Sequence, residues 1–163
     1  MLNSIAILGR PNVGKSSLFN KLTKSRNAIV SDFSGLTKDR NFGYATFKDH
    51  QYLVIDTGGV GSEITEFSAA ITEQALIAAE DSNLILFLID ASQELTADDI
   101  DLFQSIRKMN KKFFVVLNKI DIKNRSNAKE DLLKLGCGDV LEISAEHSQG
   151  IKELQTYISK QFI

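Results

Sequence analysis

The stretch Gly9-Arg10-Pro11-Asn12-Val13-Gly14-Lys15-Ser16 follows a short apolar run over residues 5–8 and opens a helical pattern over 15–24. A strand, a glycine-bounded turn and a helix in this order form the context in which a G-x4-G-K-S loop surrounds phosphate groups with backbone N–H groups. The start of the helix adds a favourable potential for anions. The stretch therefore predicts a phosphate-binding loop in a chain that alternates strands with helices.

The residue types within this loop predict separate roles. Glycine lets the backbone N–H groups turn inward, because no Cβ stands in the way. We expect Lys15 to reach the β- and γ-phosphate oxygens and Ser16 to ligate Mg²⁺. The alternative interpretation is a glycine-rich turn with an exposed lysine. The residues expected to contact the phosphates or the ion are Gly9, Arg10, Pro11, Asn12, Val13, Gly14, Lys15, Ser16 and Ser17.

Other apolar runs along the chain indicate the rest of a sheet. Continuous runs of this length are typical of parallel strands buried on both faces, and they lie at 5–8, 52–55, 84–89, 113–117 and 140–143. Residues 42–47 alternate more, which indicates an antiparallel edge strand paired with 51–55 through a turn at 48–50. Helical patterns lie between these runs, at 15–24, 66–80, 97–109, 127–135 and 150–161.

This alternation predicts an α/β fold, a three-layer, doubly wound, mostly parallel six-stranded sheet with one antiparallel edge strand, as in P-loop NTPases. Such sheets bind ligands beyond the carboxyl ends of their strands, where every one of these runs ends in a polar or glycine residue. No segment is rich in Pro, Gly or Ser. Residues 1–163 are therefore expected to form a single domain.

The composition is that of a globular protein. Hydrophobic residues make up 43% and charged residues 25%, and the net charge of −2 gives no strong overall field toward nucleic acid or an anionic membrane. The single cysteine, Cys137, excludes an internal disulfide. No apolar run approaches the length of a membrane span, and no secretory signal is visible. We expect a cytoplasmic protein with no membrane or disulfide partner.

A second motif, Asp56-Thr57-Gly58-Gly59, ends another strand. A carboxylate at this place holds Mg²⁺ in P-loop enzymes, and the Gly59 N–H is expected to contact a γ-phosphate. On its own the D-x-x-G pattern is weak, because Asp and Gly are ordinary turn residues. Val60 follows it directly.

A third motif, Asn118-Lys119-Ile120-Asp121, follows the run 113–117. Guanine presents two neighbouring N–H donors that one carboxylate accepts, whereas adenine offers no such pair, so Asp121 predicts guanine over adenine. We expect Asn118 to tie this loop to the phosphate loop and the Lys119 stem to cover the base. Ser144 and Ala145 follow the last strand, where the Ala145 N–H is expected to meet the guanine O6.

Thr37 lies between the first helix and the edge strand. Its position predicts a hydroxyl that joins Mg²⁺ and closes over the γ-phosphate when GTP is bound. Lys38 and Arg40 beside it are more typical of a solvated loop than of arginine-finger groups. The basic run 107–112 is likewise more typical of a helix end than of an RNA contact.

Taken together, these motifs resemble the first GTP-binding domain of the bacterial Der/EngA GTPase family, within the translation-factor-like class. The resemblance covers essentially the whole chain, and its most discriminating detail is Asp-Thr-Gly-Gly at 56–59, where relatives usually have Asp-Thr-Pro-Gly. It also rests on these segments: residues 9–20, Ala28-Ile29-Val30, residues 35–40, Asn118-Lys119-Ile120-Asp121 and Ser144-Ala145-Glu146-His147. One departure is Phe33-Ser34-Gly35, where the family has Thr-Pro-Gly.

The resemblance implies several properties. Family members carry two such domains and a KH-like domain and act in assembly of the large ribosomal subunit, so this chain resembles a fragment lacking the second G domain and the KH-like domain. Val60 stands where Ras-like enzymes place a glutamine, which implies slow intrinsic hydrolysis. Relatives use K⁺ held partly by the asparagine at the position of Asn12; a residue that stabilises its own turn is the alternative.

The expected activity is Mg²⁺-dependent hydrolysis of GTP to GDP and phosphate, with Lys15, Asn12, Thr37 and Gly59 at the reacting phosphate. The alternative is a binding module in which guanine-nucleotide occupancy controls docking and turnover is incidental. A P-loop ATPase or kinase is disfavoured by Asp121.

Overall fold

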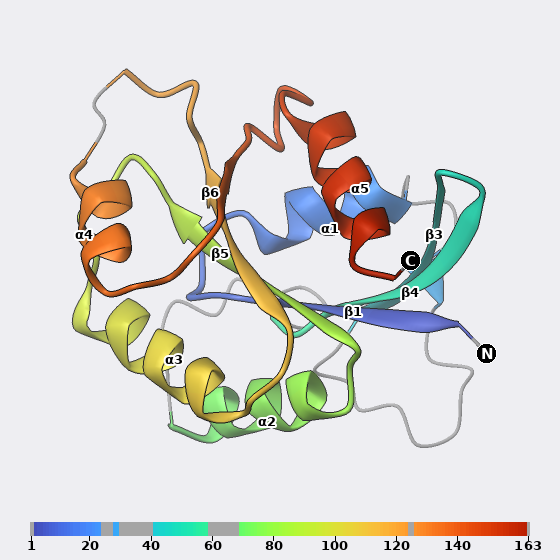
Figure 1. The fold of residues 1–163 in the computed structure, drawn as a ribbon, viewed down its shortest axis with the longest axis horizontal. Coiled ribbons are helices and arrows are strands. Elements are labelled where there is room, and N and C mark those ends of the chain that lie inside the picture. Colours follow the sequence, from blue (N-terminus) through green and yellow to red (C-terminus); the bar gives the residue numbers. More distant parts are fainter. Residues whose placement is uncertain (1, 24–27, 30–40, 59–68, 124–125, 163) are drawn as a thin grey trace.

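A central sheet with helices on both faces organises the molecule (Figure 1). The structure is a computed structural model, and it describes residues 2–23, 28–29, 41–58, 69–123 and 126–162. The strands are β1 (Asn3–Leu8), β2 (Ala28–Ile29), β3 (Asn41–Phe47), β4 (His50–Asp56), β5 (Leu84–Asp90), β6 (Phe113–Asn118) and β7 (Val140–Glu142). The helices are α1 (Lys15–Thr23), α2 (Ala69–Glu80), α3 (Ala97–Lys108), α4 (Ala128–Lys134) and α5 (Ile151–Lys160).

Within the described residues the strands follow the order β2-β3-β4-β1-β5-β6-β7. The four pairs from β4 to β7 are parallel, and β3 is antiparallel to β4. The predicted α/β class, strand types and doubly wound order are confirmed. Among the described residues the sheet has seven strands rather than the six predicted, because the two-residue strand β2 pairs with β3 on its outer side. The strand predicted at the edge, over 42–47, is therefore second from the edge. Two residues carry no periodicity, which is why the sequence did not reveal this strand.

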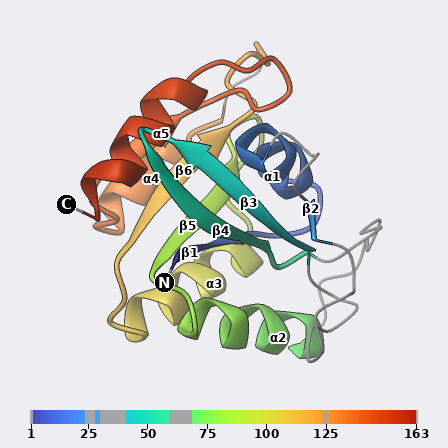
Figure 2. The ribbon, with the colours of Figure 1, turned by 90° about the vertical axis from the view of Figure 1, so that its right-hand side faces the viewer.

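Two cores, one on each face of the sheet, explain the continuous apolar runs. Along β1, Ile5 and Ile7 pack in the core under α1 and α5, while Ala6 and Leu8 pack in the core under α2, α3 and α4. Figure 2 shows α1 and α5 on one side of the sheet and α2 and α3 on the other. Because successive side chains of a strand point to opposite faces, both sets must be apolar.

A tight hairpin joins β3 to β4. Phe47 pairs with His50, so the turn contains Lys48 and Asp49, whose φ angles are 52° and 65°. Two central residues with positive φ form the turn whose twist suits a two-residue hairpin. The predicted turn is therefore present.

The carboxyl ends of four strands meet at one edge of the sheet. Ile7 of β1 is in register with Asp56 of β4, and Asp90 of β5 is in register with Asn118 of β6. The chain leaves β1 directly into the glycine-bounded loop. The fold therefore brings together segments that are far apart in sequence. In the part of the chain that the structure describes, no helix has the length and apolarity needed to cross a membrane.

Candidate functional site

The ammonium group of Lys15 lies inside the glycine-bounded loop. Its Nζ donates hydrogen bonds of 2.8 Å to the carbonyl oxygens of Gly9 and Arg10. Burial lowers the pKa of Lys15 from 10.5 to about 8, although the carboxylate of Asp56 opposes the shift. A cation held here with few water contacts is well placed to receive phosphate oxygens, because charge interactions strengthen where water is excluded.

Ser16 and Asp56 face each other across the start of α1. The Ser16 hydroxyl donates to Asp56 Oδ2 at 3.2 Å, and the Gly58 N–H donates to Asp56 Oδ1 at 2.9 Å. Burial raises the pKa of Asp56, while Gly58, Lys15 and Ser16 hold it down. A hydroxyl and a carboxylate are hard oxygen donors of the kind that Mg²⁺ prefers. The pair therefore fits the expected ion. The described residues contain no cluster of three or more His, Cys, Asp or Glu side chains that could hold a metal ion.

Two glycines of the site stand where a side chain would collide with its neighbours. Gly14 has a φ of 104°, and a Cβ at this position would lie 2.1 Å from Asn118 Nδ2. A Cβ at Gly58 would lie 2.7 Å from Lys15 Cε. At Gly14 the positive φ and the close contact together require glycine. At Gly58 a side chain would instead displace the end of the Lys15 side chain.

Asn118 joins three segments of the site. Its Nδ2 donates to the Val13 carbonyl at 3.0 Å, and its Oδ1 accepts the Ala145 N–H at 2.9 Å. The side chain is buried. The loop after β6, the phosphate loop and the segment after β7 are therefore held as one unit. The Ala145 N–H, expected to face the base, is directed at Asn118 in this structure.

Asp121 lies at a cavity of about 170 Å³ next to the phosphate loop. Its Oδ1 accepts the Ser144 hydroxyl at 2.7 Å, and His147 Nε2 lies 3.2 Å from its Oδ2. The hydrogen bond from Ser144 is the main cause that lowers the pKa of Asp121. The cavity is lined by Gly14, Ser17, Asn118, Lys119, Asp121, Ile122, Ser144 and Glu146.

The carboxylate of Asp121 borders the cavity and can accept hydrogen bonds from a ligand. Besides Ser144 and His147, the Asp121 backbone N–H donates to this carboxylate, and a carboxylate has about four lone-pair sites in all. A pair of neighbouring N–H donors, such as guanine presents, is the kind of ligand that a carboxylate accepts. The cavity and the carboxylate together fit a guanine base.

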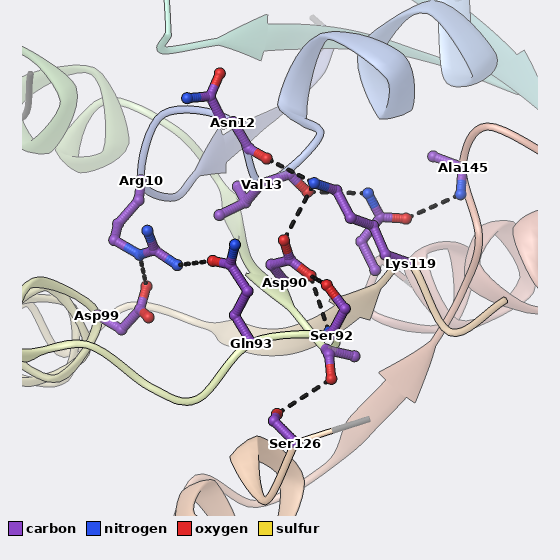
Figure 3. A network of polar contacts seen from close by, with 12 residues as sticks. Arg10, Asn12, Val13, Asp90, Ser92, Gln93, Asp99, Lys119, Ser126 and Ala145 are labelled. Carbon is purple, nitrogen blue, oxygen red and sulfur yellow. Dashed lines mark hydrogen bonds and ion pairs between the residues drawn. The ribbon is translucent and has the colours of Figure 1, made fainter. Parts of the chain in front are cut away.

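Lys119 connects the same cavity to the phosphate loop. Its Nζ donates to the Asn12 carbonyl at 2.8 Å and lies 3.1 Å from Asp90 Oδ2 (Figure 3). Asp90 ends β5, and its Oδ1 accepts the N–H and the hydroxyl of Ser92 at 2.9 and 2.5 Å. In Figure 3 the side-chain amide of Asn12 points away from these contacts. That amide is therefore free to face a ligand of the loop.

Arg10 fastens the other side of the loop to α3. Its Nε donates to Asp99 Oδ1 at 2.7 Å, and its Nη2 donates to Gln93 Oε1 at 3.4 Å (Figure 3). Asp99 also completes a capping box with Thr96 at the start of α3. No spacing in the sequence predicts the contact of Asp99 with Arg10, which lies 89 positions away.

The remaining predicted residues differ in their surroundings. The Thr57 hydroxyl donates to the Ile7 carbonyl at 2.8 Å, and the Ile120 N–H donates to the Ile143 carbonyl at 3.2 Å, so both anchor their loops to strands. Pro11 is half-buried within the phosphate loop. Other predictions fall outside the described residues: Thr37, Gly59, Val60, Lys38, Arg40 and the segment Phe33-Ser34-Gly35.

Sequence reasoning missed three titratable side chains beside the predicted motifs, Asp90, Asp99 and His147. Asp90 ends an apolar run at the edge where the carboxyl ends of the strands meet, and this position was the available signal. Asp99 lies in the first turn of α3, and no motif spacing links it to Arg10. His147 is 55% exposed, yet it contacts Asp121.

The comparisons with known proteins agree with this geometry. A family model described as 50S ribosome-binding GTPase matches residues 4–119. The chain is 43% identical over 166 residues to the GTPase Der of Pseudoalteromonas atlantica, a match that covers 99% of the chain and 34% of that protein. The GTPase Der of Legionella pneumophila is also 43% identical, over 100% of the chain and 35% of that protein. These matches confirm the resemblance to the Der/EngA family.

Solved structures share the fold over nearly the whole chain. Era from Aquifex aeolicus, crystallised with GDP and AlF₄⁻, has a TM-score of 0.76 and 31% identity, over 98% of this chain and 56% of that one. The G domain of the T. maritima FeoB iron transporter has a TM-score of 0.74 and 27% identity, over 98% of both chains. The chain spans about a third of the curated relatives that it matches. From the family model and from this site, the chain belongs to the 50S ribosome-binding GTPase family.

Proposed function

We propose that this chain is a Mg²⁺-dependent GTP-binding and GTP-hydrolysing switch domain. One observation supports it above the others: Asn118 holds the phosphate loop at Val13 and the segment after β7 at Ala145. The cavity beside Asp121 and the loop around Lys15 therefore belong to one rigid unit. A ligand with a guanine at one end and phosphates at the other fits such a unit.

In this proposal the base is selected by Asp121. Its carboxylate oxygens would accept the N1–H and N2–H of guanine, while adenine offers the carboxylate no such pair of donors. Gly14 and Ser17 line the floor of the cavity on the phosphate-loop side. In this proposal ATP is rejected because adenine gives the Asp121 carboxylate no donors, and not because adenine fails to fit the shape of the cavity.

The phosphates are bound and oriented by the loop. Lys15 would exchange its contacts with the Gly9 and Arg10 carbonyls for phosphate oxygens or share them. Ser16 and Asp56 would hold Mg²⁺, which neutralises charge on the transferring phosphoryl group. Thr37 and Gly59 are proposed to close over the γ-phosphate and to report the nucleotide state to a partner.

Hydrolysis is proposed to be slow and activated by potassium. Val60, after the D-x-x-G motif, offers no hydrogen bond to orient a water molecule. The amide oxygen of Asn12 is the proposed protein ligand of K⁺, which would supply positive charge near the phosphates. Asn12 has a left-handed backbone conformation, with a φ of 69°, and its side chain is exposed.

Base recognition is tested by nucleotide affinity. Asp121→Asn should shift preference from GDP toward XDP, because the amide donates where the carboxylate accepted. Unchanged GDP affinity in D121N would show that Asp121 does not read the base. Competition by ATP at an affinity near that of GTP would point to an ATPase instead.

Turnover is tested by phosphate release in KCl and in NaCl at matched ionic strength. Faster release in KCl, lost in Asn12→Ala, supports the proposed ion site, and equal rates in both salts would contradict it. Release no faster than in buffer under either salt would favour a second function, a guanine-nucleotide-controlled binding module.

The cellular setting is proposed from the relatives. Action in biogenesis of the large ribosomal subunit, a cytoplasmic location, and cooperation with a second G domain and a KH-like domain in the same protein follow the Der/EngA resemblance. Sedimentation with 50S subunits in the presence of a non-hydrolysable GTP analogue, compared with GDP, tests the ribosomal part.

A further inference from the structure

Asp90 is a buried carboxylate that the proposed reaction does not use. Its side chain is 3% exposed at the end of β5. Burying a carboxylate is costly unless its oxygens find partners, and both oxygens have them here. The two hydrogen bonds from Ser92 to Oδ1 are an ordinary turn contact. The contact of Oδ2 with Lys119 is long-range and calls for a separate explanation.

Lys119 is held at both ends. Its backbone follows β6 with a φ of 67°, next to Asn118, whose side chain is fixed between Val13 and Ala145. Its ammonium lies between Asp90 Oδ2 and the Asn12 carbonyl. The aliphatic stem is therefore held at both of its ends. Among the described residues that line the cavity, Lys119 is the only lysine.

A free lysine side chain has many rotamers, and ordering it on binding costs entropy. If the Lys119 ammonium were bonded only to the Asn12 carbonyl, the stem would be loosely held, because one neutral carbonyl is a weak partner for a cation. A buried carboxylate adds a charge-assisted contact and removes most of that freedom before the ligand arrives.

We propose that Asp90 is a positioning residue for the nucleotide base. It holds the ammonium of Lys119 so that the lysine stem forms a preformed wall of the cavity and the Asn12 carbonyl keeps its place. Asp90 itself does not touch the nucleotide. This inference rests on the proposed guanine-nucleotide binding and adds a residue that acts through Lys119.

Two substitutions break the pair from opposite sides. Asp90→Asn keeps an oxygen for Ser92 and removes the charge. Lys119→Met keeps an apolar stem and removes the ammonium. The double variant D90N/K119M leaves no buried charge unpaired, so it remains a folded reference where a single variant unfolds. GDP affinity of each is measured by titration calorimetry, with thermal unfolding as the check on folding.

If Asp90 acts through Lys119, D90N and K119M should each weaken GDP binding about tenfold, and the double variant should be no weaker than K119M. Ser92→Ala is the matched control: it removes a hydrogen bond from the other oxygen of Asp90 and should change GDP affinity less than about twofold. A loss in S92A as large as that in D90N would show that Asp90 only stabilises its turn.

Two other outcomes overturn the inference. Multiplicative losses in the double variant would mean that Asp90 acts independently of Lys119. Unchanged GDP affinity in D90N and K119M, with tight binding by the wild-type chain, would reject the positioning role while the proposed function stands. Failure of the wild-type chain to bind GDP would instead reject the proposed function, and the inference with it.

Discussion

The guanidinium of Arg10 is bonded to the carboxylate of Asp99, with Nε 2.7 Å from Oδ1. Asp99 lies at the third position of α3, where its Oδ2 also accepts the Thr96 N–H at 3.0 Å. One buried carboxylate thus caps a helix and anchors the phosphate loop, whose Arg10 carbonyl in turn accepts Lys15. This pair therefore connects the start of α3 to the position of the Lys15 ammonium group.

Asp99→Ala should therefore cost more than a lost cap. Removing the cap contact alone destabilises a protein by about 1 kcal/mol, and leaving a mostly buried guanidinium unpaired adds to this, for a total of about 2–3 kcal/mol. Urea unfolding measures the loss. Thr96→Ala, which removes the cap hydrogen bond but keeps Arg10 paired, is the control at about 1 kcal/mol. Equal losses in D99A and T96A would show that the pair with Arg10 contributes nothing.

Lys15 should make both stability and nucleotide binding depend on pH near 8. Its folded pKa of about 8 lies below the ordinary 10.5, so the unfolded chain binds more protons between these values. The free energy of unfolding of the nucleotide-free protein therefore rises with pH across that window, and the burial penalty is fully present below pH 8. Urea unfolding between pH 7 and 10 tests the sign.

Phosphate groups reverse this preference, because they hold Lys15 in its charged form. GDP binding at pH 8 should take up about half a proton per nucleotide, as expected for a group with a pKa of about 8 that becomes fully protonated. Calorimetry in two buffers with different ionisation enthalpies measures the uptake, and pH 7 serves as the control with far less. Equal heats in both buffers at pH 8 would contradict this assignment.

Ser144 should control the pKa of Asp121, the carboxylate proposed to bind the base. Its hydroxyl is the main cause that holds the pKa of Asp121 below the ordinary value, so Ser144→Ala should raise that pKa and weaken GDP binding about tenfold, a loss typical of one hydrogen bond to a charged group. Carbon NMR of the Asp121 carboxyl follows the titration. His147→Ala removes the more exposed partner and should have the smaller effect. An unshifted Asp121 titration in S144A would refute the assigned cause.

Gly14 should tolerate no side chain, because two costs coincide there. Gly14→Ala places a Cβ 2.1 Å from Asn118 Nδ2 on backbone with a φ of 104°. We expect a loss of about 3 kcal/mol, of which the positive φ explains about 1–2 kcal/mol, and a loss of nucleotide binding as Asn118 is displaced. Thermal unfolding and GDP titration measure both.

Gly138→Ala is the matched control for that substitution. Gly138 has a φ of 79°, but a Cβ there would have no atom within 4 Å. Only the backbone strain of about 1–2 kcal/mol should appear, with GDP binding unchanged. If both alanine variants lost the same stability and bound GDP alike, the contact with Asn118 would not explain the need for glycine.

Much of the fold followed from local patterns. In the part of the chain that the structure describes, the apolar runs and the alternating segment 42–47 predicted every strand except β2, and the helical patterns overlap all the helices. These predictions succeeded because strand burial and helix amphipathicity repeat along the chain. A two-residue strand has no repeat to detect. Strand β2 is recognised only from its pairing with Phe42 and Gly43 of β3, which the tertiary structure shows.

The sequence by itself determined that a phosphate loop, a D-x-x-G motif and an N-K-x-D motif occur in this order, because each motif is a short spacing of residue types with its own chemistry. Only the tertiary structure decided which side chains hold those motifs in place. Arg10 and Asp99 are 89 positions apart, and Asp90 meets Lys119 because β5 and β6 lie in register. Ion pairs between distant segments leave no spacing in the sequence, since the sheet rather than the chain brings their charges together.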